Sequence, residues 1–440
     1  MITTLAMKEV LFPDSFLWGA GAAGHQIEGD NVHSQYNQME RDDSPNFPVK
    51  SGKACNHWEL YREDIDLFAS MKLQVYRMSL EWSRIEPEQG RYDESALARY
   101  LDILERLNSR GIKVCLTLHH WSHPQWFEAL GGFEKRENVK YFEKHLNYIV
   151  PKIKDYVHLW VVLNEFNNHG INPPKFYLYK NLLLAHARGY HVIKQYSKAP
   201  ISSTHALIHW QPQRSFDPMD RAAADVLDWC QNEFFIHAIK TGELVLPYTD
   251  AESSDEVKGS LDYWAVNYYT RHMASARNAL FSAPRFPFDR VNMIDEPMYH
   301  EEFYPDGFVQ HLPRFTDRPI YICENGCCCD DDRLRVIYLA RHLSALREAM
   351  KMGADVRGYM HWSVMDNYEW GSFKPRFGLI DVDFKTFKRM LKPSAHLYRE
   401  IIENHGLTED LLKKYVRPLS DIQVYPPPAG PLAAAVPIGN

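Results

Sequence analysis

Short runs of apolar and β-branched residues alternate along the chain with longer stretches in which apolar residues recur every three or four positions. The short runs are typical of strands, and the longer stretches are typical of helices with one buried face. We expect strands over residues 16–26, 75–82, 113–121, 158–165, 201–210, 261–270, 319–325 and 356–366. We expect amphipathic helices between them, most clearly over residues 58–71, 97–107, 139–153 and 336–350.

This alternation predicts the fold class. Strands that alternate with helices favour a parallel sheet, and eight such units favour its closure into a barrel. We therefore expect an α/β protein, a single-domain (β/α)₈ TIM barrel over residues 1–417, because such barrels can exceed about 400 residues. A two-domain chain is the alternative raised by a length of 440 residues. Residues 418–440 are rich in Pro and Ala and are expected to form a C-terminal extension.

A doubly wound open sheet is the competing arrangement. It would carry a glycine-rich turn after the first strand, and the GAGAAG sequence at residues 19–24 fits the GxGxxG pattern. That segment lies inside the strand pattern and continues as QIEG rather than as a helix, so we reject the dinucleotide-binding interpretation. Residues 271–304 are rich in Pro, Phe and Arg and are expected to form a long loop over the barrel mouth.

Composition and charge narrow the classes of partner. The chain is 45% apolar and 24% charged with a net charge of −7, which suits a globular protein and predicts neither nucleic acid nor a membrane surface as partner. It has no apolar run long enough to span a bilayer. Residues 1–12 lack a secretory pattern, and seven cysteines is an odd number, so we expect a cytoplasmic protein with reduced thiols. The sequence neither predicts nor excludes a homo-oligomer.

Polar residues gather where the predicted strands end, which is where barrel enzymes carry their chemistry. Glu165 and Glu324 end the fourth and seventh predicted strands. Two carboxylates at one barrel mouth suggest an acid/base and a nucleophile acting at an acetal carbon, provided that one holds a proton while the other stays ionised. We expect Arg77 and Tyr269 to keep Glu324 charged, and desolvation beside Phe166 to raise the pKa of Glu165.

Other conspicuous residues have simpler interpretations. His119, Trp82 and Trp160 are expected to be core residues. A metal site built on His119 and His120 is the main enzymatic rival, but the first strand lacks the His-x-His pair that such barrels use. The CCCDDD run at residues 327–332 lacks the spacing of a zinc site, and we expect a solvated acidic loop that caps the next helix. We therefore expect no metal and no cofactor.

Seven segments resemble, in order, those of glycoside hydrolase family 1, the β-glucosidase and β-galactosidase family. The resemblance covers residues 11–404, and its segments are FLWGAGAAGHQIEG, YRMSLEWSRIEP, HHW, VLNE, NYYT, YICENG and HWSVMDNYEW. It implies a retaining exo-β-glycosidase that takes a small-molecule β-glycoside or oligosaccharide, with Glu165 as acid/base and Glu324 as nucleophile. It implies that Arg77, Asn267 and Tyr269 support the nucleophile. It further implies that the sugar is bound by Gln26, His120, Trp121, Asn164, Trp362, Glu369 and Trp370.

The chain departs from the family pattern beside these residues. Phe166 replaces the Pro after the acid/base, Cys323 replaces the Thr before the nucleophile, and Ser122-His123 replaces Asp-Leu. His25 stands where Tyr usually precedes the glutamine. None of these changes removes a group from the mechanism, but they bear on the local backbone and on the pKa of Glu165.

The resemblance also bears on the substrate. Family members that act on 6-phosphorylated sugars carry Ser and a Lys-Tyr pair near the last strand, whereas this chain carries Glu369-Trp370. We therefore expect neutral β-D-glucosides as substrates, together with β-galactosides and β-fucosides, because one Glu discriminates poorly between epimers. Asn167, Asn168, His169 and residues 271–304 are expected to shape the aglycone side. A non-catalytic sugar-binding barrel and a transglycosidase using the same residues remain the alternatives.

Overall fold

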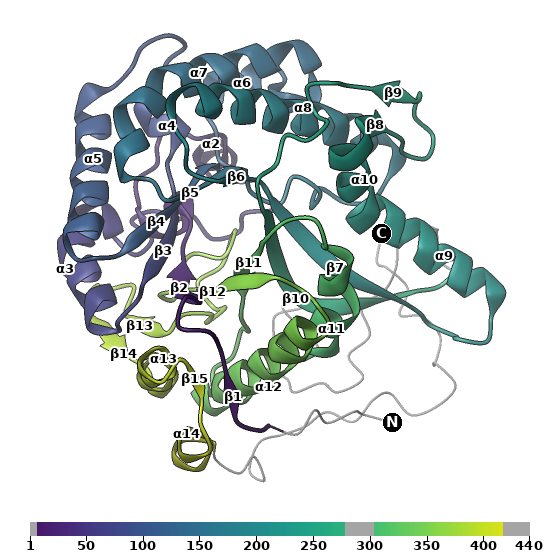
Figure 1. Cartoon of the computed structure of the whole chain (residues 1–440). Coiled ribbons are helices and arrows are strands. Elements are labelled where there is room, and N and C mark those ends of the chain that lie inside the picture. Colours follow the sequence, from purple (N-terminus) through teal and green to yellow (C-terminus); the bar gives the residue numbers. More distant parts are fainter. Residues whose placement is uncertain (1–6, 278–302, 417–440) are drawn as a thin grey trace.

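The computed structural model describes residues 7–277 and 303–416, and its central element is one parallel sheet. The strands of this sheet follow the order β6-β5-β4-β3-β2-β12-β11-β10-β7 (Figure 1). Their bounds are β2 (Leu17–Gly21), β3 (Val75–Ser79), β4 (Lys113–His119), β5 (Leu159–Leu163), β6 (Ile201–Ser202), β7 (Thr204–Pro212), β10 (Trp264–Ala274), β11 (Ile320–Asn325) and β12 (Val356–Trp362).

The sheet closes on itself at Ser203. β6 pairs with β5 and β7 pairs with β10, and only this one residue separates β6 from β7, so the two are halves of one strand. The Ser203 hydroxyl oxygen accepts a hydrogen bond from the backbone N–H of Leu163 at 3.0 Å, in place of a main-chain carbonyl. The eight predicted strands are thereby confirmed as a closed (β/α)₈ barrel.

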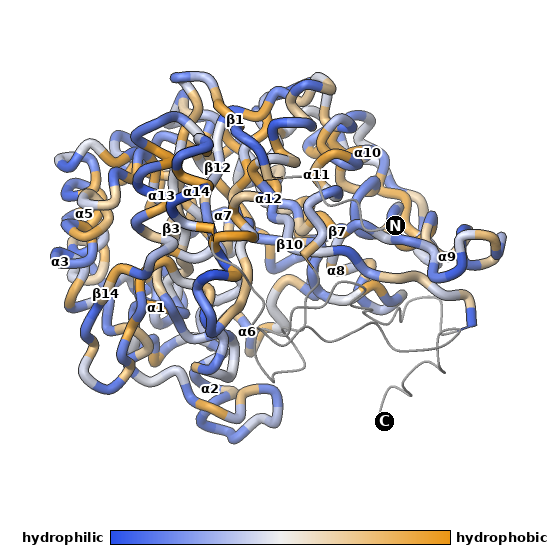
Figure 2. Tube along the Cα trace, turned by 90° about the horizontal axis from the view of Figure 1, so that it is seen from below, coloured by the Kyte–Doolittle hydropathy of each residue, from blue (hydrophilic) through white to orange (hydrophobic). Residues whose placement is uncertain are grey.

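Helices cover the outside of the barrel, and each of the four clearest sequence expectations corresponds to one of them (Figure 1). In the tube view the helices alternate between hydrophobic and hydrophilic stretches, as amphipathic helices do (Figure 2). Asp93 caps the N-terminus of α5 by accepting from the backbone N–H groups of Ser95 and Ala96. The outer helices are α3 (His57–Ser70), α5 (Glu94–Ser109), α7 (Val139–Ile153), α8 (Pro173–Tyr196), α9 (Pro218–Asp228), α10 (Phe234–Thr241), α12 (Asp332–Lys351) and α13 (Pro393–Glu403).

Shorter elements accompany the barrel. One antiparallel pair joins the first described strand to the last, β1 (Val10–Leu11) with β15 (Gly406–Leu407). Two further small pairs are β8 (Glu243–Leu244) with β9 (Glu252–Ser253), and β13 (Ile380–Val382) with β14 (Arg389–Leu391). The short helices are α1 (Gly24–Ile27), α2 (Gln35–Arg41), α4 (Trp82–Ile85), α6 (Gln125–Ala129), α11 (Asp306–His311) and α14 (Glu409–Tyr415).

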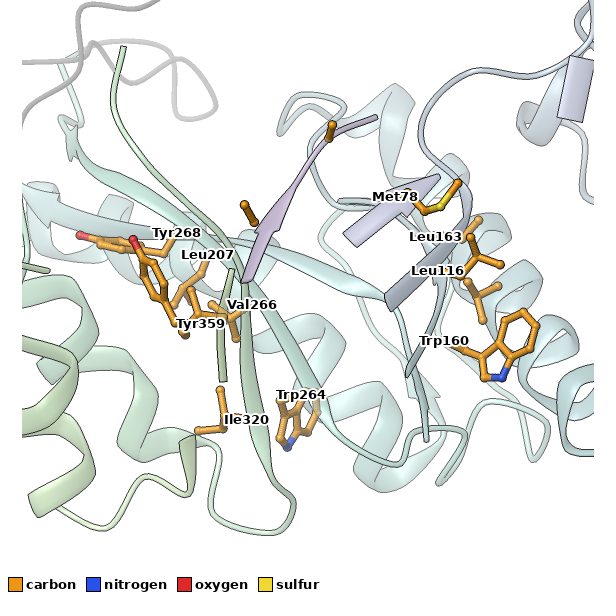
Figure 3. Packing of buried hydrophobic residues seen from close by; sticks show 14 of the residues in the cluster. Met78, Leu116, Trp160, Leu163, Leu207, Trp264, Val266, Tyr268, Ile320 and Tyr359 are labelled. Atoms are coloured by element: carbon orange, nitrogen blue, oxygen red, sulfur yellow. The ribbon is translucent and has the colours of Figure 1, made fainter. Parts of the chain in front are cut away.

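The hydrophobic core has two layers. The larger layer fills the space between the strands and the helices, where Trp160, Leu116 and Trp264 lie (Figure 3). The smaller layer fills the barrel itself, so that the barrel is a packed core rather than a pore. Its buried members are Val75, Cys115, Leu159, Val161, Tyr263, Ala265, Cys323 and Met360. Trp82 and Trp160 are fully buried, which confirms their interpretation as core residues.

Three expectations need correction. The first strand ends at Gly21, and the glycine-rich segment does lead into a helix, although α1 is only four residues long. The continuation of this segment as a helix is not visible in the sequence, because a single helical turn leaves no pattern of spaced apolar residues. The expected loop at 271–304 begins too early, since β10 continues to Ala274. The remainder of that loop from residue 278 to 302, the division at residue 417 and the extension 418–440 lie outside the described residues.

No helix in residues 7–277 and 303–416 is both long enough and apolar enough to cross a membrane.

Candidate active site

All strands of the barrel are parallel, so the residues at their carboxyl ends meet at one mouth. Glu165 follows β5 and Glu324 lies within β11, and both side chains are buried. Asn164 lies between them, because its Oδ1 accepts from Arg77, which binds Glu324, and from Asn267, which binds Glu165. The structure therefore brings the two candidate carboxylates into one hydrogen-bonded site, as the sequence predicts.

Both oxygens of Glu324 are held by strong donors. Arg77 donates from Nη1 to Oε1, and the Tyr269 hydroxyl donates to Oε2 at 2.6 Å. Burial opposes the charge of Arg77, but the adjacent Glu324 raises the pKa of that guanidinium above its already high range. Burial and the charge of Glu324 raise the pKa of Tyr269 well above its ordinary value, so Tyr269 remains a donor. Both oxygens of the Glu324 carboxyl group are therefore occupied by donors that the fold holds in place.

Glu165 has the opposite environment. Burial and then the negative charge of Glu324 raise its pKa to about 7. Two amide donors oppose this shift: Asn267 Nδ2 at 3.0 Å from Oε1 and Asn168 Nδ2 at 3.0 Å from Oε2. The backbone of Glu165 has a φ of 43°, a left-handed conformation that side chains other than glycine rarely adopt. Glu165 is thus a carboxyl group that can hold a proton near neutral pH.

The residue after Glu165 is part of the core. The Phe166 ring is buried and meets the Phe235 ring edge-on, with centroids 4.7 Å apart and planes at 70°. Desolvation is the first cause of the raised pKa of Glu165, as expected. Cys323, before Glu324, lies fully buried inside the barrel beside Met360.

Asn164 and His120 form the next part of the site. Asn164 Oδ1 accepts from Arg77 Nη2 at 2.5 Å and from the Thr204 hydroxyl at 2.8 Å. Burial and the charge of Arg77 lower the pKa of His120 well below its ordinary value, so its neutral ring faces Asn164 Nδ2 at 3.1 Å.

Thr204 also belongs to the site, although it is not among the residues that the sequence predicts there. Its hydroxyl also accepts from the backbone N–H of Glu165 at 2.9 Å. A β-branched residue in the middle of a predicted strand is expected to be a core residue. Thr204 differs from such a residue because it lies directly after the break at Ser203.

Gln26 and Glu369 meet at the far side of the mouth. Gln26 lies on α1, and its Nε2 donates to Glu369 Oε2 at 3.0 Å and to Asn367 Oδ1 at 3.1 Å. Gln26 Oε1 is buried and finds no hydrogen-bond partner within the described part of the chain, and the same holds for Trp121 Nε1. A buried acceptor and a buried donor of this kind suit a ligand that carries hydroxyl groups.

Aromatic rings surround this polar pair. The His120 ring stacks on Trp362 with centroids 5.8 Å apart, and Trp121 packs against Trp370 at 5.1 Å. His25 also stacks on Trp370, with centroids 5.7 Å apart and planes at 9°. Trp121 and Trp370 have positive φ values of 64° and 43°, so two further residues of the mouth adopt the strained conformation seen at Glu165.

Several other predicted residues lie outside this arrangement. Asn167 is buried and bonds the backbone of Ala206 and Gln231, so it does not face the mouth, which corrects its assignment to the aglycone side. His119 pairs with His123 at 3.2 Å. Both rings line a cavity of about 270 Å³, which is also lined by Trp121, Asn164, Phe166 and His169.

The cysteine run is buried rather than solvated. Cys327 and Cys329 pack with Leu334 and Tyr338, whereas Cys328 packs with Trp362 and Phe377. Asp331 accepts from the backbone N–H of Arg333 and caps α12, as expected for the acidic part of the run. Within residues 7–277 and 303–416, no three His, Cys, Asp or Glu side chains are grouped so that they could hold a metal ion.

The chain is similar to proteins of known activity over nearly its whole length. The sequence profile of glycosyl hydrolase family 1 matches residues 8–407. A β-galactosidase of Saccharolobus solfataricus is 30% identical, over 91% of this chain and 96% of its own. A 1,4-β-D-glucan glucohydrolase of Thermotoga neapolitana is 28% identical, over 90% of this chain and 99% of its own. The solved structure of a β-glycosidase from Pyrococcus horikoshii superposes with a TM-score of 0.83 at 35% identity, covering 93% of this chain and 99% of its own.

Proposed function

The chain belongs to glycosyl hydrolase family 1 and is a β-glycosidase, and from that premise we propose that it is a retaining exo-enzyme for neutral β-D-glucosides. We expect β-galactosides and β-fucosides to be hydrolysed as well. The proposal assigns Glu165 as acid/base and Glu324 as nucleophile. It assigns sugar binding to Gln26, His120, Trp121, Asn164, Trp362, Glu369 and Trp370, and support of the nucleophile to Arg77 and Tyr269. Asn267 was expected to support the nucleophile, but it donates to Glu165 Oε1 at 3.0 Å, so its role is corrected to support of the acid/base.

The observation that carries this proposal is the contrast between the two carboxyl groups. Glu324 accepts from a guanidinium and a phenol, whereas the side-chain donors to Glu165 among the described residues are neutral amides, and its pKa is raised to about 7. A carboxyl group that holds a proton near neutral pH, beside a second one whose oxygens are held by a guanidinium and a phenol, can serve as the acid while the second serves as the nucleophile. A non-catalytic sugar-binding barrel would have no need of this contrast.

The two steps follow from these states. In the first step, protonated Glu165 gives its proton to the glycosidic oxygen while Glu324 attacks the anomeric carbon, which releases the alcohol and leaves a covalent glycosyl-enzyme. In the second step, Glu165 is a carboxylate and takes a proton from water, whose oxygen attacks the anomeric carbon and displaces Glu324. Two displacements at one carbon give net retention.

The preference for neutral sugars rests on Glu369. Its carboxylate is buried and accepts from Gln26 at 3.0 Å, so a sugar placed against this pair would find a negative charge there. A 6-phosphate group would repel that charge in a site with little water to screen it. Hydroxyl groups donate to the same carboxylate and are favoured for the same reason.

A panel of aryl β-glycosides tests the proposal, in neutral and 6-phosphorylated forms. We expect turnover of the neutral members, first release of the β-anomer in proton NMR, and loss of turnover by at least about 10³-fold in Glu324→Gln. Unchanged turnover in Glu324→Gln would overturn the nucleophile assignment, and first release of the α-anomer would overturn retention. A chelator-treated sample is run in parallel, because loss of activity in that sample alone would point to metal chemistry. A sugar acceptor in the same assay separates transglycosylation from hydrolysis.

A further inference from the structure

The two oxygens of Glu165 are held by two different asparagines. Asn267 lies on β10, is buried, and donates to Oε1 at 3.0 Å. Asn168 lies in the segment between β5 and α8, is exposed, and donates to Oε2 at 3.0 Å. Glu165 is therefore bound by one asparagine amide from the core and by a second asparagine amide from the side that faces solvent.

Asn168 also belongs to the turn that Glu165 begins. Its backbone N–H donates to the Glu165 carbonyl at 2.9 Å, and Glu165 itself has a φ of 43°. The chain thus folds back within three residues, and this places the Asn168 amide over the carboxylate at the start of the turn.

The two donors differ in how freely they can leave. Asn267 Nδ2 also lies 3.3 Å from Asn164 Oδ1, so it is fixed from two sides in the core. The side chain of Asn168 makes no other hydrogen bond within the described residues, and it borders solvent. A carboxylate oxygen is a stronger acceptor than a carboxyl oxygen that carries a proton, so protonation weakens the hydrogen bond from an N–H donor. The proton is therefore accommodated at Oε2, where the donor can withdraw.

We propose that Asn168 is a positioning residue that holds Oε2 of Glu165 in the carboxylate form and withdraws when Oε2 carries the proton given to the leaving group. This inference rests on the proposed role of Glu165 as acid/base. It assigns the exposed asparagine to the second step, in which Glu165 must be a carboxylate aimed at water. It assigns the buried Asn267 to both steps.

Other charged groups also act on Glu165, and the test must separate them. Glu324 on β11 is the neighbouring negative charge, Arg77 on β3 is the neighbouring positive charge, and the Tyr269 hydroxyl on β10 borders both carboxyl groups. None of them is changed by a substitution at Asn168. A donor to the carboxylate favours its charged form, so removing that donor raises the pKa of Glu165.

The experiment compares wild type with Asn168→Ala and Asn168→Asp on an activated and an unactivated aryl β-glucoside. With the activated substrate we expect kcat and KM of Asn168→Ala to fall together by roughly three- to tenfold while kcat/KM is kept, because only the second step is slowed. With the unactivated substrate we expect the alkaline limb of kcat/KM to move up by about half a unit to one unit. Asn168→Asp keeps the shape of the side chain but adds a negative charge, so we expect a larger upward shift.

Two controls fix the interpretation. Asn172→Ala removes an amide from the same segment, without a hydrogen bond to Glu165, and is expected to match wild type. Glu165→Ala must abolish the alkaline limb, and a limb that persists there would overturn the proposed function itself. The inference about Asn168 is overturned, while the assignment of Glu165 stands, in either of two cases. In the first case, Glu165→Ala loses the alkaline limb but both Asn168 variants keep it at the wild-type pH. In the second case, kcat/KM and kcat of the Asn168 variants fall equally at every pH.

Discussion

Tyr269 donates its hydroxyl proton to Oε2 of Glu324 at 2.6 Å, from the strand next to the one that carries Glu324. Arg77 donates to the other oxygen from β3, which is not adjacent to β11 in the sheet. The carboxylate is therefore held from two directions by side chains that the barrel itself positions. Fixed donors of this kind need no reorganisation during the reaction.

Tyr269→Phe removes one of these two donors and leaves the ring in place. A hydrogen bond to a charged group contributes about 1.5–3 kcal/mol, so we expect kcat/KM to fall by roughly 10- to 100-fold. Steady-state kinetics on an aryl β-glucoside measures the effect. Tyr268→Phe is the matched control, because its hydroxyl donates to the carbonyl of Tyr304 rather than to the site. Equal losses in the two variants would contradict the role given to Tyr269.

The raised pKa of Glu165 predicts how activity depends on pH. The first step needs its acid form, so we expect kcat/KM to fall as pH rises through about 7. Profiles of kcat/KM against pH for wild type and Glu165→Gln test this. A limb near pH 7 that survives in the residual activity of the variant would assign the titration to another group.

The same shift predicts a dependence of stability on pH. The folded-state pKa of about 7 lies above the ordinary value of 4.5, so Glu165 stabilises the fold fully below pH 4.5 and loses this contribution as pH rises to about 7. Glu165→Gln does not titrate, and we expect it to be more stable than wild type at pH 8 by up to about 3 kcal/mol. The difference should disappear near pH 4.5. Urea unfolding at the two pH values measures it, and a constant difference would contradict the burial of a titrating carboxyl group.

The barrel could be predicted from the sequence because both of its layers leave local patterns. Continuous apolar runs mark strands buried on both faces, and spaced apolar residues mark the helices. Glu165, Glu324 and their neighbours could be found because parallel strands bring their carboxyl ends together. The bounds were less accurate: Gln26 was placed on a strand but lies on the one-turn helix α1.

The contacts within the site could not be predicted in this way, because they join residues that are distant in sequence. Thr204 binds both Asn164 and Glu165 only because β7 begins next to the break at Ser203. The burial of Cys328 depends on Trp362 and Phe377, which belong to the next strand and its loop. The sequence around Thr204 and the sequence around Cys328 contain no pattern that indicates these contacts.

From the position of Glu369 we predict the ratio of the kcat/KM values for a neutral substrate and its 6-phosphate. For wild type we expect kcat/KM on an aryl β-glucoside to exceed that on its 6-phosphate by at least about 100-fold, because juxtaposed like charges cost several kcal/mol. In Glu369→Gln we expect this ratio to shrink, with activity on the neutral substrate also reduced. The two substrates serve as each other's control within one enzyme preparation. A ratio that stays the same would mean that the phosphate is excluded by shape or by another charge.

The packing of Phe166 next to Glu165 leads us to predict that substitutions at Phe166 affect both stability and activity. Its ring meets that of Phe235 at 4.7 Å, and both side chains are buried. We expect Phe166→Ala to lower the free energy of unfolding by about 3–5 kcal/mol. A double-mutant cycle with Phe235→Ala should show a coupling of about 0.5–1.5 kcal/mol.

Phe166→Ala should also lower the activity of the folded enzyme. Glu165 has a positive φ, and the anchored ring beside it helps to hold that strained conformation. Loss of the anchor lets the backbone relax and moves the carboxyl group away from the glycosidic oxygen. Activity on a substrate that needs protonation should therefore fall more than activity on an activated one. Phe235→Ala removes the same ring contact without altering the residue next to Glu165, so a smaller catalytic effect there would place the constraint on the backbone at Phe166, and equal effects would place it in the packing of the two rings.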